Sequence, residues 1–537
     1  MNTLFRTDRI RRVVNDLQGL IYENPVSVPL TWLPGYYASP ADAARGLPGA
    51  VPFPDDQVWG GRNSYAWSHG EAVLPALRPG TRAELLVTTA DGEGADTARL
   101  SGFVGAPASR WDLMNPQFML FVNGQLIQGL DVHHQAAVLQ PDASGRAVID
   151  LQGYAGMTDR RCVLHVCVAV ARTSVRALYY DLLTALEAAE TMDENDPTRL
   201  TLMNCLNDAC SMLDLRVPGS PAFQAGLHSA SAHLAQTVYT GSRSDVTAVC
   251  VGHSHIDVAW LWDHAQTRLK TRRTFSTVLR LMEEHPGFTF FHSTPQLFQW
   301  LNRDDPDLYE GVKRRVAEGR FELDGAMWLE ADCNIPSGES LIRQIVYGKR
   351  FLRGEFGTEC EVLWLPDVFG YSAALPQILA QTGIRTFVTT KISWNMLNKM
   401  PYDTFEWQGI DGSRVLTYFI TTTDPKQEDG SFGTTYNGIL HPASIAGGWK
   451  RYQQKELNHT ILVAYGYGDG GGGPDEEMLE KGERLQRGIA GFPQVQLGHV
   501  RPFFQALHET VDGAKYLPTW VGELYLELHQ GAYTSAA

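Results

Sequence analysis

The feature that most limits the fold is a regular alternation of strand and helix patterns that begins at Val246. Seven short runs rich in apolar residues follow one another, and most are separated by stretches with helical spacing. The runs are TAVCVG, FTFFHS, RFELDGAMW, EVLWLP, RTFVTTK, RVLTYFI and TILVAYGYG. Such alternation predicts parallel strands joined by helical crossovers. Seven strands favour a parallel (β/α) barrel, and an open doubly wound sheet is the alternative.

The chain before Val246 has a different pattern of predicted secondary structure. The 537 residues of the whole chain are enough for two to four domains. Residues 1–59 read as an amphipathic helix and a Pro/Gly-rich connector. Residues 60–174 contain short strand patterns, with Asn123-Gly124 as a two-residue hairpin signal, and predict an antiparallel β-sandwich. Residues 175–245 predict a helical linker, and residues 246–537 the barrel. The predicted fold class is therefore α/β.

Charge and cysteine content narrow the class of function. Lys and Arg total 45 against 60 Asp and Glu, a formal charge of −15, and no basic stripe is present. This disfavours a nucleic-acid partner. The seven scattered cysteines indicate reduced thiols in a cytoplasmic protein. We expect no membrane span, because no apolar run reaches about 18 residues. An Arg-rich organelle presequence is the minority reading of the N-terminus, since Asp8 and Asp16 interrupt it.

Ionisable and aromatic residues recur where the predicted strands end, which is where parallel α/β folds carry their sites. The first strand runs into VGHSHIDVAWLWDH, in which His253, His255 and Asp257 alternate. A strand points alternate residues to one side, and His-x-Asp there is typical of half a metal site. Trp260 follows just beyond these residues, and the other strand ends carry Trp328, Glu330, Asp332, Asp367, Lys391, Trp394, Asn395 and Asp469. We expect these groups to converge on one rim.

Each of these residues also has a purely structural interpretation. A single aspartate such as Asp367 can cap the next helix, and Lys391 can be a solvated loop lysine. The GDGGGGP segment can be only a turn, and it is not a phosphate loop because no Gly-Lys-Ser/Thr follows. His133 and His134 mimic a ligand pair, but they belong to the sandwich, away from the rim, and we assign them a structural role. The structural interpretation must explain coincidences at five strand ends, so we favour a site.

Assembled, these segments resemble the α-mannosidases of glycoside hydrolase family 38, and most closely their cytosolic and bacterial branch. The resemblance covers about Val246 to Ser535. It rests on HSHIDVAWLW, GAMWLEADCNIPSGES, WLPDVFGYSAALPQIL, GYGDGGGGP and GELYLELHQGAYTS. The sandwich and the linker are similar to the N-terminal part of that branch more loosely. The resemblance implies a metal-dependent hydrolase that releases terminal α-linked mannose from oligosaccharides.

The resemblance also implies roles for individual residues. The ligands of a zinc ion, or of cobalt or another divalent metal, would be His255, Asp257, Asp367 and His529. Asp367 would also be the catalytic nucleophile, and Asp469 the general acid/base. Trp260 would form an aromatic floor under the sugar. The implied substrate-binding set is Trp260, Trp328, Asp332, Lys391 and Trp394.

The implied reaction retains the configuration at the anomeric carbon. Asp367 attacks that carbon while Asp469 protonates the departing oxygen, and Asp469 then activates the water that releases the sugar. The two carboxyl groups of a retaining enzyme lie about 5–5.5 Å apart. A metal held by His255 and Asp257 would orient the neighbouring hydroxyls of mannose rather than activate water.

Members of the family continue beyond LHQGAYTS into helical and β-rich domains, whereas this chain ends at Ala537. We therefore expect a truncated catalytic domain that needs a C-terminal partner chain or forms a homo-oligomer. Two alternative functions stay open. One is a metal-dependent carbohydrate deacetylase, which would use Asp257 near a metal-bound water and need no nucleophile at Asp367. The other is a non-catalytic sugar-binding remnant, or one subunit of a split enzyme.

Overall fold

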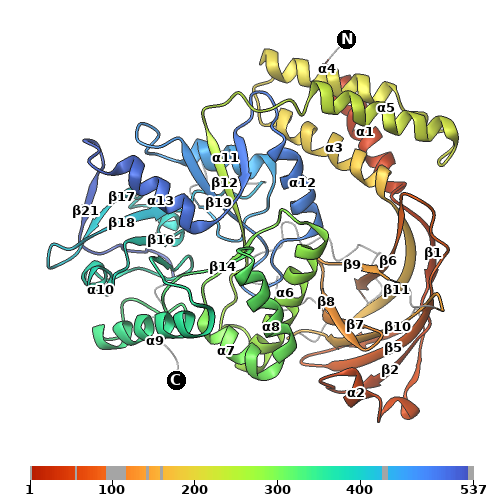
Figure 1. Ribbon diagram of the computed structural model, residues 1–537, viewed down its shortest axis with the longest axis horizontal. Coiled ribbons are helices and arrows are strands. Elements are labelled where there is room, and N and C mark those ends of the chain that lie inside the picture. The colour runs from red at the N-terminus through yellow and green to blue at the C-terminus, as the bar shows by residue number, and fades with distance from the viewer. Residues whose placement is uncertain are drawn as a thin grey trace.

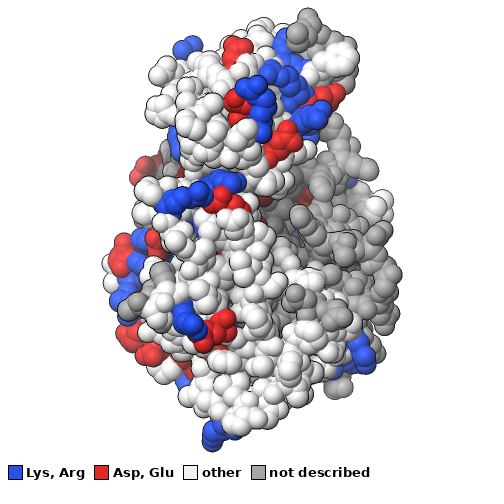
Figure 2. Space-filling model, turned by 90° about the vertical axis from the view of Figure 1, so that its right-hand side faces the viewer, with Lys and Arg blue, Asp and Glu red and all other residues white. Residues whose placement is uncertain are grey.

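The computed structural model describes residues 3–54, 57–91, 116–140, 144–157, 161–425 and 433–529. Figure 1 shows two antiparallel sheets at the right, a group of helices at the top, and a mixed region of strands and helices at the left and centre. None of the described helices is long and apolar enough to cross a membrane. On the face seen in Figure 2, basic and acidic side chains are interspersed and are not gathered by sign.

The first eleven strands form two antiparallel sheets. One sheet has the order β1-β11-β6-β9 with β4 paired to β11, and the other has the order β3-β2-β5-β10-β7-β8. Leu85 of the first sheet packs in one cluster with Leu120 and Ile149 of the second, so the sheets form a sandwich. Asn123 and Gly124 form the predicted hairpin between β7 and β8, with φ values of 51° and 83°.

The bounds of these strands show where the sequence pattern was incomplete. They are β1 (Tyr22–Ser27), β2 (Leu30–Pro34), β3 (Val51–Phe53), β4 (Val58–Gly60), β5 (Tyr65–Val73), β6 (Thr81–Asp91), β7 (Gln117–Val122), β8 (Gln125–Leu130), β9 (Ala136–Leu139), β10 (Arg146–Tyr154) and β11 (Arg161–Arg172). The first four belong to the segment predicted as a helix and connector. They are short, and β1 contains Pro25 and mostly exposed residues, so only pairing with β11 reveals it as a strand.

Helices from both ends of the first 245 residues pack together at the top of Figure 1. They are α1 (Thr3–Gly19), α3 (Thr173–Glu190), α4 (Pro197–Ser211) and α5 (Pro221–Thr237). Ile10, Val14 and Leu17 lie on one face of α1 and are buried in the same cluster as the apolar residues of α3 and α4. A short helix, α2 (Pro40–Ala43), and a 3-10 turn (Leu47–Gly49) lie between β2 and β3.

All seven strands predicted after Val246 are present. They are β12 (Thr247–His253), β13 (Phe290–His292), β14 (Phe321–Leu323), β15 (Val362–Trp364), β16 (Thr386–Thr389), β18 (Arg414–Phe419) and β19 (Thr460–Tyr465). The helices are α6 (His264–Glu284), α7 (Pro295–Asp304), α8 (Pro306–Ala317), α9 (Gly338–Phe356), α10 (Leu375–Gln381), α11 (Pro442–Arg451), α12 (Glu476–Gln486) and α13 (Val500–Val511), and a 3-10 turn spans Lys391–Trp394. Three further strands were not predicted: β17 (Thr404–Gln408), β20 (Gln494–Leu497) and β21 (Thr519–Val521).

The predicted closed seven-stranded barrel is not confirmed, because the strands form two sheets. One has the order β14-β13-β12-β19 with β20 beside β12, and the other has the order β15-β16-β18-β17-β21. Within the described residues, hydrogen bonds from side chains connect the two sheets at the positions where strand pairing would close a barrel. The Asp324 carboxylate accepts the backbone N–H groups of Glu361 and Val362 at 3.3 Å, between β14 and β15. Between β18 and β19, the Tyr418 hydroxyl accepts the N–H of Leu462 at 3.0 Å.

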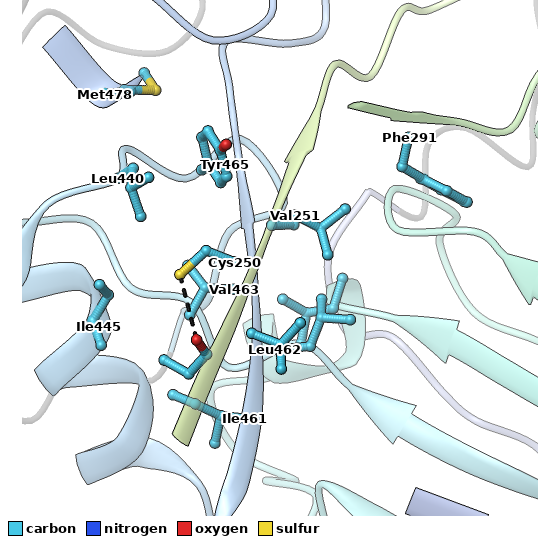
Figure 3. Packing of buried hydrophobic residues seen from close by; sticks show 14 of the residues in the cluster. Cys250, Val251, Phe291, Leu440, Ile445, Ile461, Leu462, Val463, Tyr465 and Met478 are labelled. Carbon is cyan, nitrogen blue, oxygen red and sulfur yellow. Dashed lines mark hydrogen bonds between the residues drawn. The ribbon is translucent and has the colours of Figure 1, made fainter. Parts of the chain in front are cut away.

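The core of this region is apolar and continuous. In Figure 3, Cys250 of β12 lies beside Val463 of β19, with Ile445 of α11 and Met478 of α12 around them. All four side chains are buried. Burial on both faces explains why β12 and β19 read as unbroken apolar runs and not as alternating ones. This packing fixes the strand ends, which carry the predicted site.

Candidate active site

Four residues from the ends of three parallel strands gather at one edge of the two sheets. His255 and Asp257 follow β12, Asp367 follows β15, and Asp469 follows β19. One potential ligand atom from each lies within 4.8 Å of those of the others. We call these residues the carboxylate–histidine cluster. They include three of the four predicted metal ligands together with the predicted acid/base.

Glu330, which follows β14, supports two members of the cluster. Its Oε2 lies 3.0 Å from Nδ1 of His255, and its Oε1 accepts the backbone N–H of Asp367 at 2.7 Å. Because Nδ1 faces this carboxylate, Nε2 of His255 is the nitrogen turned to Asp257 (3.3 Å) and Asp367 (3.7 Å). The sequence placed Glu330 on the rim but gave it no role. Its position at a strand end was the signal.

Asp469 is held by groups that the sequence did not indicate. Its Oδ1 accepts hydrogen bonds from the Tyr436 hydroxyl at 2.9 Å and from Nδ2 of Asn437 at 2.8 Å. Its backbone carbonyl accepts the N–H of Asp257 at 2.9 Å, and its φ is 60°. Tyr436 and Asn437 lie beyond β18 in an irregular segment without a motif, so only the folded chain brings them to the site.

Lys391 forms an ion pair with Asp367 and is buried. Its Nζ lies 4.0 Å from the centroid of the Trp394 ring, a cation–π contact. The ammonium therefore faces the nucleophile candidate on one side and an aromatic ring on the other. A buried cation beside a carboxylate favours the ionised carboxylate.

The cluster holds more negative than positive charge. Burial raises the pKa of Asp257 to about 6, and the neighbouring Asp469 and Asp367 add to the rise while His255 opposes it. Burial alone would lower the pKa of His255, but Glu330 and Asp257 outweigh it and hold that pKa well above its usual value. The surrounding carboxylates thus favour a positive charge at Nε2 of His255, and a bound cation would supply that charge in place of the proton.

The predicted aromatic residues have different surroundings. Trp260 is 48% exposed and contacts Trp262 edge-on, so its ring is available to a ligand. Trp328 donates its Nε1–H to Gln296 at 3.0 Å, and Asp332 accepts the N–H groups of Asn334 and Ile335. Trp328 is thus bound to helix α7, and Asp332 to the backbone of its own loop.

Two predicted or considered histidines lie outside the cluster. His529 is exposed, and its ring centroid is 4.7 Å from that of Phe369. His253 is buried below the site against Trp364, and burial lowers its pKa well below the usual value, so it is neutral.

His133 and His134 were expected to lie away from the rim. That expectation is wrong, because both contact the loop that carries Asp469.

The family model for the N-terminal domain of glycosyl hydrolases family 38 matches residues 245–523. The chain belongs to glycoside hydrolase family 38. All four members of the carboxylate–histidine cluster and Glu330 lie inside the family 38 region, whereas His529 lies outside it.

Several proteins named as α-mannosidases are similar to this chain. Alpha-mannosidase G of Dictyostelium discoideum is 43% identical over 296 residues, 55% of this chain and 26% of that protein. Alpha-mannosidase 2C1 of Homo sapiens is 38% identical over 371 residues, 69% of this chain and 34% of that protein. The alpha-mannosidase of Saccharomyces cerevisiae is 41% identical over 293 residues, 53% and 26% of the two chains. The chain thus spans about a quarter to a third of the length of these relatives.

A solved structure of an alpha-mannosidase from Enterococcus faecalis is also similar to this family 38 chain. It has a TM-score of 0.42 and 18% identity, and the match covers 52% of this chain and 31% of that one.

Proposed function

We propose that this chain carries the active site of a zinc-dependent retaining α-mannosidase that hydrolyses terminal α-linked mannose from oligosaccharides. The observation that carries the proposal is the pairing of two carboxylates, Asp367 and Asp469, beside a His–Asp donor pair on one rim. Membership of family 38 and relatives named as α-mannosidases support the same reading. Mannose-containing oligosaccharides are the proposed substrates.

The residues of the cluster fit a divalent metal. His255 offers an imidazole nitrogen, and Asp257 and Asp367 offer carboxylate oxygens, which are donors that zinc accepts. Burial, with smaller contributions from Asp469 and Asp367, raises the pKa of Asp257, and a bound cation would oppose that rise. We keep His529, exposed beside Phe369, as a proposed further ligand. When bound, zinc supplies a positive charge that orients the substrate hydroxyls.

The reaction steps belong to the two carboxylates. Asp367, which is ion-paired with Lys391, forms a bond to the anomeric carbon as the glycosidic bond breaks. Asp469 gives its proton to the departing oxygen, then takes a proton from the water that displaces Asp367. Oxygens of the two carboxylates lie within 4.8 Å. This supports the retaining separation of about 5–5.5 Å over the inverting one of about 6.5–9.5 Å.

Trp260 and Trp394 are the proposed contacts for the sugar ring, because apolar faces of sugars pack on aromatic rings. Trp328 and Asp332 are proposed to shape the rim through their loop contacts. A closed barrel, the four domain boundaries, a cytoplasmic location, and a C-terminal partner chain or homo-oligomer stay predictions.

Hydrolysis of nitrophenyl α-mannoside by the purified chain, before and after chelation and zinc readdition, tests the function. We expect activity that is lost on chelation and restored by zinc. A mechanism-based fluorinated mannosyl fluoride should then leave one sugar on Asp367, found by mass spectrometry of peptides. A folded, zinc-loaded chain that neither hydrolyses the mannoside nor accepts the label would contradict the proposal. Deacetylation of an acetylated sugar without labelling would instead support the deacetylase alternative.

A further inference from the structure

The His133–His134 pair is a sequence motif that the proposed function leaves without a role. It lies in the turn between β8 and β9, which we call the sandwich loop (Asp131–His134). This loop contacts the glycine-rich loop (Gly466–Pro474), which follows β19 and carries Asp469. The two contacting segments are separated by more than 300 residues of chain.

Both histidines bind the glycine-rich loop, one near each of its ends. The ring of His133 stacks on Tyr467, with centroids 3.5 Å apart and planes inclined by 10°. Nε2 of His134 lies 3.0 Å from the carbonyl oxygen of Pro474. The residue pair thus spans the loop from its second residue to its last.

Asp131 fixes the orientation of both histidines. Its Oδ1 accepts the backbone N–H groups of His133 at 2.9 Å and of His134 at 3.0 Å, and lies 2.9 Å from Nδ1 of His134. His134 faces a carboxylate with one nitrogen and a carbonyl with the other, so both nitrogens donate. Burial alone would lower the pKa of His134, but Asp131 raises it, in agreement with a doubly protonated ring.

Helix α6 holds the same loop from a second side. Arg273 donates from Nη2 to the carbonyl of Gly470 at 3.0 Å, and the N–H of Gly472 donates to the Thr274 hydroxyl at 2.9 Å. Nε of Arg273 lies 3.7 Å from Oδ2 of Asp131, which connects the helix to the sandwich loop. The glycine-rich loop is therefore held between the sandwich and α6.

Asp469 lies between the two held points, Tyr467 and Gly470. Its φ of 60° lies in the left-handed region, which is uncommon for residues with a side chain although aspartate adopts it more often than most, and the contacts on either side hold the backbone there. We propose that the sandwich loop is a positioning element for Asp469, so that the N-terminal sandwich sets the geometry of proton donation. This inference rests on the proposed function, in which Asp469 protonates the leaving oxygen.

The test compares leaving groups in a His133→Ala variant of the full zinc-loaded chain. A dinitrophenyl mannoside needs little proton donation, whereas a methylumbelliferyl mannoside needs more. We expect kcat/KM to fall about tenfold or more for the second substrate and only about twofold for the first, because acid catalysis contributes about 10²–10⁴-fold. His133→Phe, which keeps a ring for stacking on Tyr467, should restore most of the loss. His165→Ala, an exposed histidine on β11 of the same sandwich, is the matched control and should change neither substrate.

Amide hydrogen exchange separates this inference from the proposed function. In His133→Ala, amides of residues 466–473 should exchange at least about tenfold faster, while those of β12 and β19 keep their protection. Equal losses for both substrates, or unchanged exchange in the glycine-rich loop, would overturn the positioning role. A wild-type chain that hydrolyses neither substrate contradicts the proposed function instead, and the exchange data then decide whether the two loops are coupled. His133→Ala, His133→Phe and His165→Ala should unfold at similar temperatures, which excludes a general folding defect.

Discussion

Glu330 contacts two members of the cluster, with one carboxylate oxygen next to the His255 ring and the other accepting the backbone N–H of Asp367. A carboxylate behind a metal-binding imidazole fixes the tautomer and the direction of the ring. The same side chain here also fixes the backbone that presents the nucleophile candidate. The proposed ligand set therefore depends on a residue that would touch neither metal nor sugar.

We predict that Glu330→Gln weakens zinc binding by about 10–100-fold, the usual effect of losing such a partner. Competition with a coloured chelator measures the affinity directly, without any activity assay. Glu339→Gln is the matched control, because Glu339 lies on the exposed face of α9 in a surface pair with Arg343. Equal zinc affinities for the two variants would show that Glu330 does not support the site.

In the metal-free protein, the free energy of unfolding should depend on pH through the ionisation of Asp257. Its pKa near 6 exceeds the ordinary value, so the folded chain keeps a proton that the unfolded chain releases. This contribution is fully present below about pH 4 and is lost as the pH rises through about 6. Asp257→Asn mimics the protonated form and should match the wild type near pH 4.

Well above pH 6 the same variant should be more stable than the metal-free wild type by roughly 3 kcal/mol. Denaturant unfolding in chelator at a series of pH values gives both curves. With zinc added the order should reverse, because the variant has lost a carboxylate ligand. Two parallel curves in chelator would contradict the crowding of carboxylates described for this cluster.

At the scale of elements, the glycine-rich loop is close to its neighbours at two glycines for different reasons. Gly466 has a φ of +134°, and a Cβ there would overlap with the His253 carbonyl oxygen. Gly468 has no such backbone restriction, but a Cβ would overlap with Oδ1 of Asn437, whose amide holds Asp469. Gly466 thus requires glycine for its backbone conformation, and Gly468 requires it because of a neighbouring side chain.

Gly468→Ala should therefore lower kcat for a mannoside by about 10–100-fold, because Asn437 must move away from Asp469. The unfolding temperature should change little, since the overlap is with a side chain, and the backbone nitrogen of His255, 3.1 Å from the Cβ position, needs to shift by only a few tenths of an ångström. Gly354→Ala in helix α9 has open space at the Cβ position and provides the control, with unchanged kcat. A normal kcat for Gly468→Ala would mean that Asn437 does not position Asp469.

Elements show which parts of the fold and site a sequence can predict. Apolar runs located all seven parallel strands, and their ends located His255, Asp257, Asp367 and Asp469, because strand ends in such folds share one edge. Tyr436 was not predicted, since its approach to Asp469 depends on the path of an irregular segment. The closure of the barrel is not confirmed for a related reason, because ladder formation between β14 and β15 depends on neighbouring side chains.

At the scale of the whole molecule, one buried ion network joins three parts of the chain. Arg176 of α3 contacts Glu84 of the sandwich at 2.7 Å and Glu476 of α12 at 2.7 Å. Arg176 and Glu84 are both buried. The network thus ties the sandwich and the helices to the region that carries the cluster.

Arg176→Met should lower the free energy of unfolding by roughly 3 kcal/mol, because Glu84 then keeps a buried charge with fewer partners. Adding Glu84→Gln to that variant should recover part of the loss, since a neutral amide replaces the charge. Arg216→Met, which breaks an exposed pair with Asp214, should change the free energy of unfolding far less. Denaturant midpoints and m values of the four proteins give these differences. Equal losses for Arg176→Met and Arg216→Met would contradict the role of the network.

The division of the parallel strands into two sheets also bears on the cluster. His255, Asp257 and Asp469 follow strands of one sheet, and Asp367 and Lys391 follow strands of the other. The joint between the sheets is bridged by side chains such as Asp324 and Tyr418 in place of a continuous ladder. An ion bound by both His255 and Asp367 would link the two sheets to each other. Loss of the ion would weaken the connection between the two sheets next to Asp367, the residue that must reach the sugar.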